Sequence, residues 1–145
     1  MNGYVAGEGP DIVLLHGLGS RWQVFEPILP ALEQTHRVHA FDLPGFGVAP
    51  LEDRVRPDVA GFADWVTEQL IARGIRSPHI VDSSMGGGIA LELARRGVAA
   101  QVTVFSPIGF WSPAERSWAQ GFLTLMRRAA QSMPGPLVSA VQTRT

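Results

Sequence analysis

The sequence predicts an α/β fold in which a parallel sheet of about four strands has helices on both of its faces. Three observations lead to this prediction. Short aliphatic runs without polar alternation recur along the first two thirds of the chain, and such runs are typical of strands covered on both faces. Segments with apolar residues at helical spacing separate these runs. Strands that alternate with helices in this way indicate crossover connections between parallel strands.

Four segments are predicted to be strands. They are Ile12 to Leu15, Arg37 to Phe41, His79 to Val81 and Gln101 to Phe105. Stretches rich in Gly, Pro or Ser follow them and end the regular structure.

Four helices are predicted. Apolar residues recur at helical spacing from Trp22 to Leu32, where Pro27 is tolerable if it lies in the first turn. A second helix begins at Pro57 and stops at Gly74, because Pro and Gly favour these two ends. A third covers Met85 to Arg96. The fourth runs from about Pro113 to Gln131, and the sequence MPGP and a short tail follow it.

Length and composition restrict the class of protein. The 145 residues, 46% of them hydrophobic, suit one globular domain. A net charge of -1 argues against nucleic acid as a partner, and the absence of cysteine excludes a disulfide framework. No apolar run approaches the roughly 18 residues of a membrane helix, and no secretory signal begins the chain. A cytoplasmic protein without a membrane partner is therefore expected.

The stretch IVDSSMGGG, residues 80–88, is where the sequence suggests chemistry. A strand that enters a helix through a tight turn lifts one side chain clear of the sheet and directs the helix N–H groups toward it. Ser84, with Gly86 two residues later, fits this arrangement for an attacking hydroxyl. Ser83 is the competitor, but it lacks a glycine two residues later.

With these motifs the chain resembles the α/β-hydrolase superfamily, in its serine hydrolase form. HGLG at residues 16–19 resembles the oxyanion loop, DLPGFG at 42–47 the loop after the next strand, and SSMGGG at 83–88 the nucleophile turn. SPIGFW at 106–111 lies where these proteins leave the sheet to build a cap. The resemblance implies a partial hydrolase core at residues 1–107 and the start of a helical cap at 108–145. It also implies the spatial order second, first, third, fourth for the four strands, which leaves both outer strands unpaired. The segment GYVAGEG, residues 3–9, would be only the remnant of an earlier strand.

The resemblance also implies roles for individual residues. Ser84 would be the nucleophile, and the backbone N–H groups of Leu18 and Met85 would form the oxyanion hole. The supporting residues would be His16, which orients the loop, and the glycines Gly17 and Gly86. Asp42 is expected to brace the turn into PGFG rather than take part in chemistry. No metal or organic cofactor is implied, and the partner would be a small-molecule substrate.

Two features depart from the pattern. Asp82 stands where the pattern has Gly or another small residue, so its carboxylate is expected either to crowd the turn and place a negative charge near Ser84 or to swing out to solvent. All four histidines, His16, His36, His39 and His79, precede Ser84. The superfamily order instead places an acid and then a histidine after the serine, and the later acids here are Glu92 and Glu115.

The sequence therefore predicts the nucleophile and oxyanion hole of a serine hydrolase for a small ester, lactone or related acyl substrate, in a truncated chain with little or no activity of its own. The alternative is a non-catalytic ligand-binding or interaction protein, or a decayed gene product, that retains the pocket. A nucleotide-binding domain is disfavoured because GLGSRW lacks the third glycine of GxGxxG. Unpaired sheet edges predict self-association.

Overall fold

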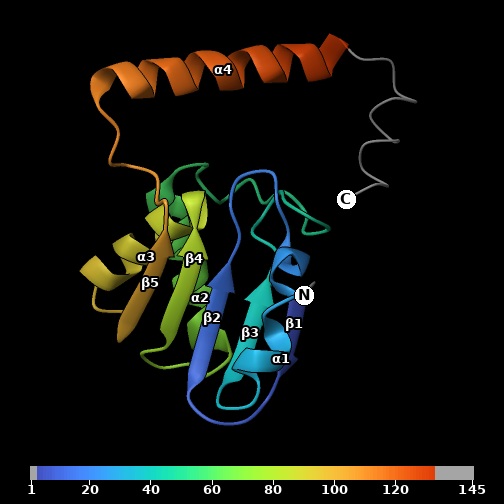
Figure 1. Ribbon diagram of the computed structural model, residues 1–145, viewed down its shortest axis with the longest axis vertical. Coiled ribbons are helices and arrows are strands. Elements are labelled where there is room, and N and C mark those ends of the chain that lie inside the picture. Colours follow the sequence, from blue (N-terminus) through green and yellow to red (C-terminus); the bar gives the residue numbers. More distant parts are fainter. Residues whose placement is uncertain (1–2, 133–145) are drawn as a thin grey trace. The chain divides into compact units, whose positions relative to one another are not determined.

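The computed structural model describes residues 3–132, which divide into two compact units, one ending at Gly109 and the other beginning at Phe110. The first unit contains a five-stranded sheet with the spatial order β1-β3-β2-β4-β5 (Figure 1). The second contains one long helix. The prediction of an α/β sheet with helices is confirmed, and the assignment of the second unit to a cap stays a prediction.

The four predicted strands are present in the predicted order. They are β2 (Asp11–Leu15), β3 (Arg37–Phe41), β4 (His79–Ser83) and β5 (Gln101–Phe105), and all four run parallel. Since parallel strands end at the same edge of a sheet, the loops after β2, β3, β4 and β5 lie at one edge. This edge carries the three sequence motifs HGLG, DLPGFG and SSMGGG.

The expectation of a mere remnant before residue 11 is wrong. Residues Gly3–Ala6 form strand β1, which pairs antiparallel with β3. Gly7 and Gly9 follow with φ of 81° and 123°, values that glycine adopts without a steric penalty, and they let the chain reverse into β2. The Tyr4 hydroxyl donates a hydrogen bond to Glu33, which ties β1 to the segment before β3.

The single helix predicted from Trp22 to Leu32 is also wrong. The structure has a short 3₁₀ helix η1 (Trp22–Phe25) and a one-turn helix α1 (Leu29–Leu32). Pro27 has no N–H to donate, and Pro30 lies in the first turn of α1, where a proline is tolerated. The two prolines therefore favour a break and a new start over one continuous helix.

The two longer helices of the first unit agree with the prediction. Helix α2 (Val59–Ala72) begins after Asp58, whose carboxylate accepts a hydrogen bond from the Gly61 N–H at 2.7 Å and so acts as the N-cap. Helix α3 (Ser84–Arg95) leads directly out of β4. Both helices are followed by a glycine with positive φ, Gly74 at 68° and Gly97 at 73°.

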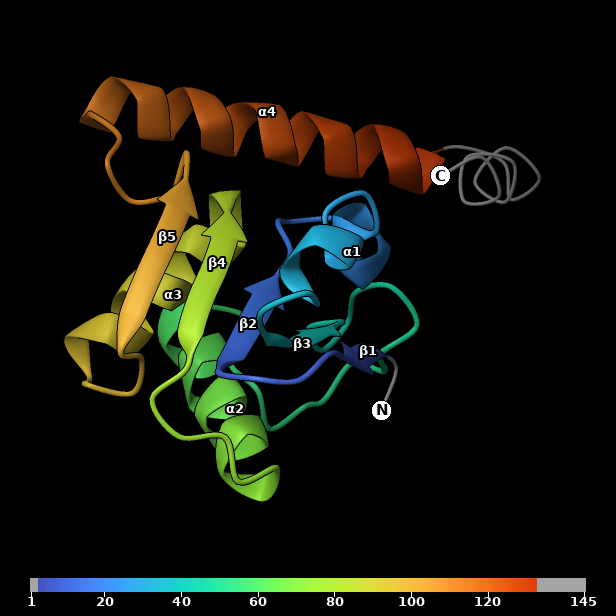
Figure 2. The same cartoon turned by 60° about the horizontal axis from the view of Figure 1, so that its bottom comes forward.

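The sheet is covered on both faces (Figure 2). Helices α2 and α3 lie on one face, and η1 and α1 lie on the other. Alternate residues of the strands supply two apolar clusters. The first holds Val13, Leu15, Phe41 and Ile80 with Trp65, Val66, Ile89 and Leu93 of the helices, and the second holds Ile12, Leu14, Val38 and Ala40 with Phe25 and Leu29.

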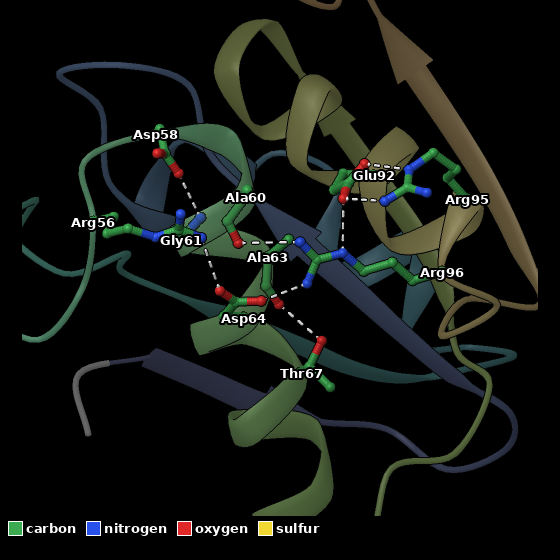
Figure 3. A network of polar contacts seen from close by, with 10 residues as sticks. All are labelled: Arg56, Asp58, Ala60, Gly61, Ala63, Asp64, Thr67, Glu92, Arg95 and Arg96. Atoms are coloured by element: carbon green, nitrogen blue, oxygen red, sulfur yellow. Dashed lines mark hydrogen bonds and ion pairs between the residues drawn. The ribbon is translucent and has the colours of Figure 1, made fainter.

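A polar network joins α2 to α3 at their solvent side (Figure 3). Arg96 contacts Asp64 of α2 at 2.6 Å and Glu92 of α3 at 2.8 Å, and it donates a longer hydrogen bond to the Ala60 carbonyl oxygen at 3.4 Å. Hydrogen bonds from Arg95 and Arg96 lower the pKa of Glu92 to about 2. Glu92 is therefore held in the ionised form and fixes Arg96, which makes the contacts from α3 to α2.

The second unit is described through helix α4 (Pro113–Ser132), which agrees with the prediction. Ser112 and Glu115 form a capping box at its start: the Glu115 carboxylate accepts from the Ser112 N–H at 2.8 Å, and the Ser112 hydroxyl accepts from the Glu115 N–H at 3.3 Å. Trp118 and Phe122 stack on this helix, with their ring centroids 5.5 Å apart.

The predicted MPGP tail lies outside the described residues. Among the helices described, none has the length and apolar character needed to cross a membrane.

Candidate active site

Ser84 stands at the turn from β4 into α3. Its φ is 52°, a left-handed value that non-glycine residues rarely adopt, and its side chain is exposed. Ser83, one residue earlier, has extended backbone with φ of -137° and is only half-buried. The turn therefore presents Ser84 at the first position of the helix, where N–H groups without helical partners are concentrated.

The three glycines after Met85 allow this turn to pack closely. A Cβ atom on Gly86 would lie 2.5 Å from the Leu15 carbonyl oxygen, one on Gly87 would lie 3.0 Å from Pro107, and one on Gly88 would lie 2.7 Å from Ile108. The Ile108 N–H also donates to the Ser84 carbonyl oxygen at 3.0 Å. Sequence reasoning identified only Gly86. The signal for the others was three consecutive glycines inside a helix, where each costs about 1 kcal/mol relative to alanine.

The HGLG loop lies beside Ser84. A Cβ atom on Gly17 would approach the Ser84 Cβ to 3.3 Å and its hydroxyl oxygen to 3.7 Å. Leu18 follows with an exposed side chain, and Met85 has a buried one. The structure thus brings together the loop that contains Leu18 and the turn that contains Ser84 and Met85.

His16 is fully buried, and both of its ring nitrogens have partners. Its Nδ1 lies 2.8 Å from the Gly17 carbonyl oxygen, and its Nε2 accepts a hydrogen bond from the Leu43 N–H at 3.0 Å. An Nε2 that accepts carries no proton, so the ring is neutral with its proton on Nδ1. Burial lowers the pKa of His16 and favours the same form. The ring links the HGLG loop to the loop after β3, and it has no free nitrogen for a base.

Asp42 braces the same edge of the sheet, in agreement with the predicted structural role. Its carboxylate accepts from the Trp22 N–H at 2.8 Å and from the Val48 N–H at 3.1 Å. A Cβ atom on Gly47, whose φ is 56°, would lie 2.2 Å from this carboxylate, so the PGFG turn needs a glycine there. His16 Nε2 is 4.0 Å away but neutral, and the contact is therefore not an ion pair.

Asp82 does not reach solvent, so that expectation is wrong. Its side chain is fully buried beside Gly86, and its Oδ1 accepts a hydrogen bond from the Leu15 N–H. Burial raises the pKa of Asp82 well above its usual range. As long as the carboxyl group keeps its proton, it places no negative charge near Ser84.

Three histidines lie away from this edge of the sheet. His79 is the first residue of β4, His36 immediately precedes β3, and His39 contacts Asp11, the first residue of β2, at 2.7 Å. Because these strands run parallel, their first residues lie at the edge opposite the one that follows β4. Within residues 3–132, no three histidine, aspartate or glutamate side chains gather in a way that could hold a metal ion.

The chain matches the model of the alpha/beta hydrolase family over residues 12–143. It is 42% identical over 88 residues to a pimeloyl-[acyl-carrier protein] methyl ester esterase of Aeromonas hydrophila, an alignment that covers 61% of this chain and 33% of the esterase. The chain thus matches about a third of the length of that relative.

Solved structures give the same result. The fold superposes on an alpha/beta hydrolase fold protein from Burkholderia ambifaria with a TM-score of 0.73 and 26% identity, covering 96% of this chain and 51% of that one. It superposes on the N-acyl homoserine lactonase AidH complexed with N-butanoyl homoserine with a TM-score of 0.67 and 30% identity, covering 72% of this chain and 40% of that one. The chain spans about half the length of these structures or less.

Proposed function

Because the chain belongs to the alpha/beta hydrolase family, we propose that it carries the nucleophile and oxyanion hole of a serine hydrolase for small esters, lactones or related acyl substrates. The observation that carries the proposal is Ser84, exposed at φ of 52° on the turn into α3 with Gly17 of the HGLG loop beside it. Ser77 and Ser106 are also exposed with positive φ, so the backbone angle alone does not single out Ser84. What singles it out is its place at the start of α3, next to the packed glycines and the HGLG loop.

In this proposal, the Ser84 hydroxyl attacks the substrate carbonyl carbon, and the carbonyl oxygen becomes an oxyanion. The backbone N–H groups of Leu18 and Met85 donate to that oxyanion, a contribution of about 3 kcal/mol per donor in a water-excluded site. His16, Gly17 and Gly86 are supporting residues: His16 fixes the loop, and the two glycines let the loop and the turn approach each other. No cofactor takes part.

The proton of Ser84 must go to a base, which in this chemistry is a histidine held by a carboxylate. His16 is at the correct edge of the sheet, but both of its ring nitrogens are engaged. The 145 residues alone are therefore expected to hydrolyse esters slowly or not at all. The names of the relatives, a methyl ester esterase and a lactonase, support an ester or lactone as the substrate class.

The alternative is a non-catalytic protein that uses the same N–H groups to bind an anionic or carbonyl ligand. The exposed start of α3 and the neighbouring loop are compatible with this alternative too, because binding a ligand through N–H groups requires no base. The two functions differ in their need for the hydroxyl group. Ligand binding that survives Ser84→Ala favours the binding protein, whereas loss of all acyl transfer in that variant favours the hydrolase.

A cysteine in place of Ser84 is expected to react without the missing base. The chain has no cysteine of its own, so Ser84→Cys introduces a single thiol. The N-terminus of α3 should lower the pKa of that thiol below its usual value of about 8.5. At pH 7, Ser84→Cys is therefore expected to react with iodoacetamide about tenfold faster than Ser83→Cys. It should also release one equivalent of nitrophenolate from p-nitrophenyl acetate.

Ser83→Cys is the matched control, since it differs by one position in the same turn. Both variants are also measured in denaturant, where the two thiols should react at the same rate. Equal rates for the two folded variants, or a faster reaction of Ser83→Cys, would show that the turn does not favour position 84 and would remove the basis of the proposal.

We also propose self-association through the sheet edges. Strands β1 and β5 each have one unpaired side within the described residues, and Phe105 at the end of β5 is 60% exposed. Unpaired backbone groups on an apolar edge strand favour pairing with another chain. The apparent mass is expected to rise with protein concentration in light scattering. Thr103→Pro should reduce this rise if β5 is the pairing edge, and a constant monomer mass would contradict the proposal.

A further inference from the structure

Asp82 occupies an unusual place for a carboxyl group. It is the fourth residue of β4, opposite Leu15 at the end of β2, and it is completely buried. Leu15 immediately precedes His16 and the HGLG loop. The carboxyl group therefore lies between the strand that ends at the nucleophile turn and the strand that ends at the proposed oxyanion loop.

Burial of this carboxyl group, and not its hydrogen bond, favours the neutral form. Oδ1 accepts from the Leu15 N–H, which by itself favours the ionised form, but Oδ2 is buried with no hydrogen-bond partner within the described residues, and desolvation is the larger effect. Asp82 forms no ion pair with the described part of the chain. The residue of α3 that lies beside its carboxyl group is Gly86, which carries no charge. A buried carboxylate without a charged partner is strongly disfavoured, so the group keeps its proton.

The hydrogen bond joins residues 67 positions apart in the chain. Removing the acceptor removes this contact at Leu15, the residue where β2 ends and the loop begins. A buried N–H group that loses an acceptor costs free energy, and the start of the loop is then held less firmly against β4.

We propose that Asp82 is a positioning residue: its neutral carboxyl group holds the start of the HGLG loop against the strand that leads to Ser84. The inference uses the proposed function only to name this loop as the oxyanion loop. The attachment of the loop is measured without catalysis, so the attachment and the hydrolase proposal can fail separately.

The test is amide hydrogen exchange, resolved by residue, in the full 145-residue chain. Asp82→Leu keeps the branched shape of the side chain but is larger and has no acceptor, and Asp82→Asn keeps both the acceptor and the neutral charge. Asp82→Leu is expected to speed exchange at Leu15 and Leu18 about tenfold or more relative to Ile80, an amide inside β4 that serves as the internal reference. Asp82→Asn should restore the wild-type ratio.

Two outcomes would overturn the inference. One is a ratio of Leu15 to Ile80 exchange rates that is the same in Asp82→Leu as in wild type, which would mean that the contact does not hold the loop. The other is a raised ratio of these two rates in Asp82→Asn, because that variant keeps the acceptor that the inference relies on. If Asp82→Leu fails to fold, the wild type decides: a scalar coupling across the hydrogen bond between the Leu15 nitrogen and the Asp82 Cγ supports the inference, and its absence overturns it.

Discussion

Gly86→Ala is expected to destabilise the fold more than any other single methyl addition at the nucleophile turn. The new Cβ atom would lie 2.5 Å from the Leu15 carbonyl oxygen and 3.0 Å from that of His16. Both are backbone atoms at the end of β2, so neither can move without shifting the sheet or the HGLG loop. Overpacking of this kind costs about 3 kcal/mol. We expect the melting temperature to fall by about 10 °C or more.

The measurement is thermal unfolding followed by circular dichroism. Gly121→Ala in α4 is the matched control, since it adds the same methyl group to a helical glycine that has nothing within 4 Å of its Cβ position. Helical propensity alone makes that control neutral or stabilising. A melting temperature of Gly86→Ala equal to that of the wild type would mean that α3 can move away from β2 at little cost, and the close packing of the turn would not be required.

Local patterns predicted most of the sheet. The run Gln101 to Phe105 forms β5 with those bounds, whereas the order of the four parallel strands was an implication of the family resemblance and not of local patterns. Strand β1 was missed because its sequence is short and glycine-flanked, and its stability comes from pairing with β3 more than 30 residues later. Periodicity cannot reveal a partner at that distance.

In the proposed site, too, short motifs predicted some residues, whereas the environment of another depends on contacts with distant segments. Ser84, His16 and Gly86 belong to short motifs that specify a turn or loop by themselves, so the sequence could place them. The surroundings of Asp82 could not be placed, because its one donor, Leu15, comes from another strand and its burial depends on the packing of α3. A polar residue in a glycine position gives no local indication of whether it points to solvent or into the core.

The stability of Asp82→Asn relative to wild type is expected to rise as the pH rises. The pKa of Asp82 is raised by burial in the folded chain, whereas in the unfolded chain it returns to its usual value near 3.9. Between these two pKa values the folded state holds a proton that the unfolded state has lost. Wild-type stability therefore falls as the pH rises through this window, by up to about 1.4 kcal/mol per pH unit. Asparagine does not titrate and avoids this loss.

The difference in unfolding free energy between Asp82→Asn and wild type isolates this group, because other titrations, such as that of Glu92, cancel. The His16 backbone lies beside Gly86, as Asp82 does. Burial lowers the pKa of the His16 ring, so the ring is neutral as the pH approaches 7. Urea unfolding should give a small difference at pH 4 and a growing one at pH 5, 6 and 7. Asp53→Asn, at an exposed position, controls for the removal of one negative charge.

A difference in unfolding free energy that stays constant with pH would mean that Asp82 ionises as readily in the fold as in the unfolded chain. The interior around Oδ2 would then have to supply a compensating partner, and the neutral carboxyl group would no longer explain how an aspartate occupies a glycine position.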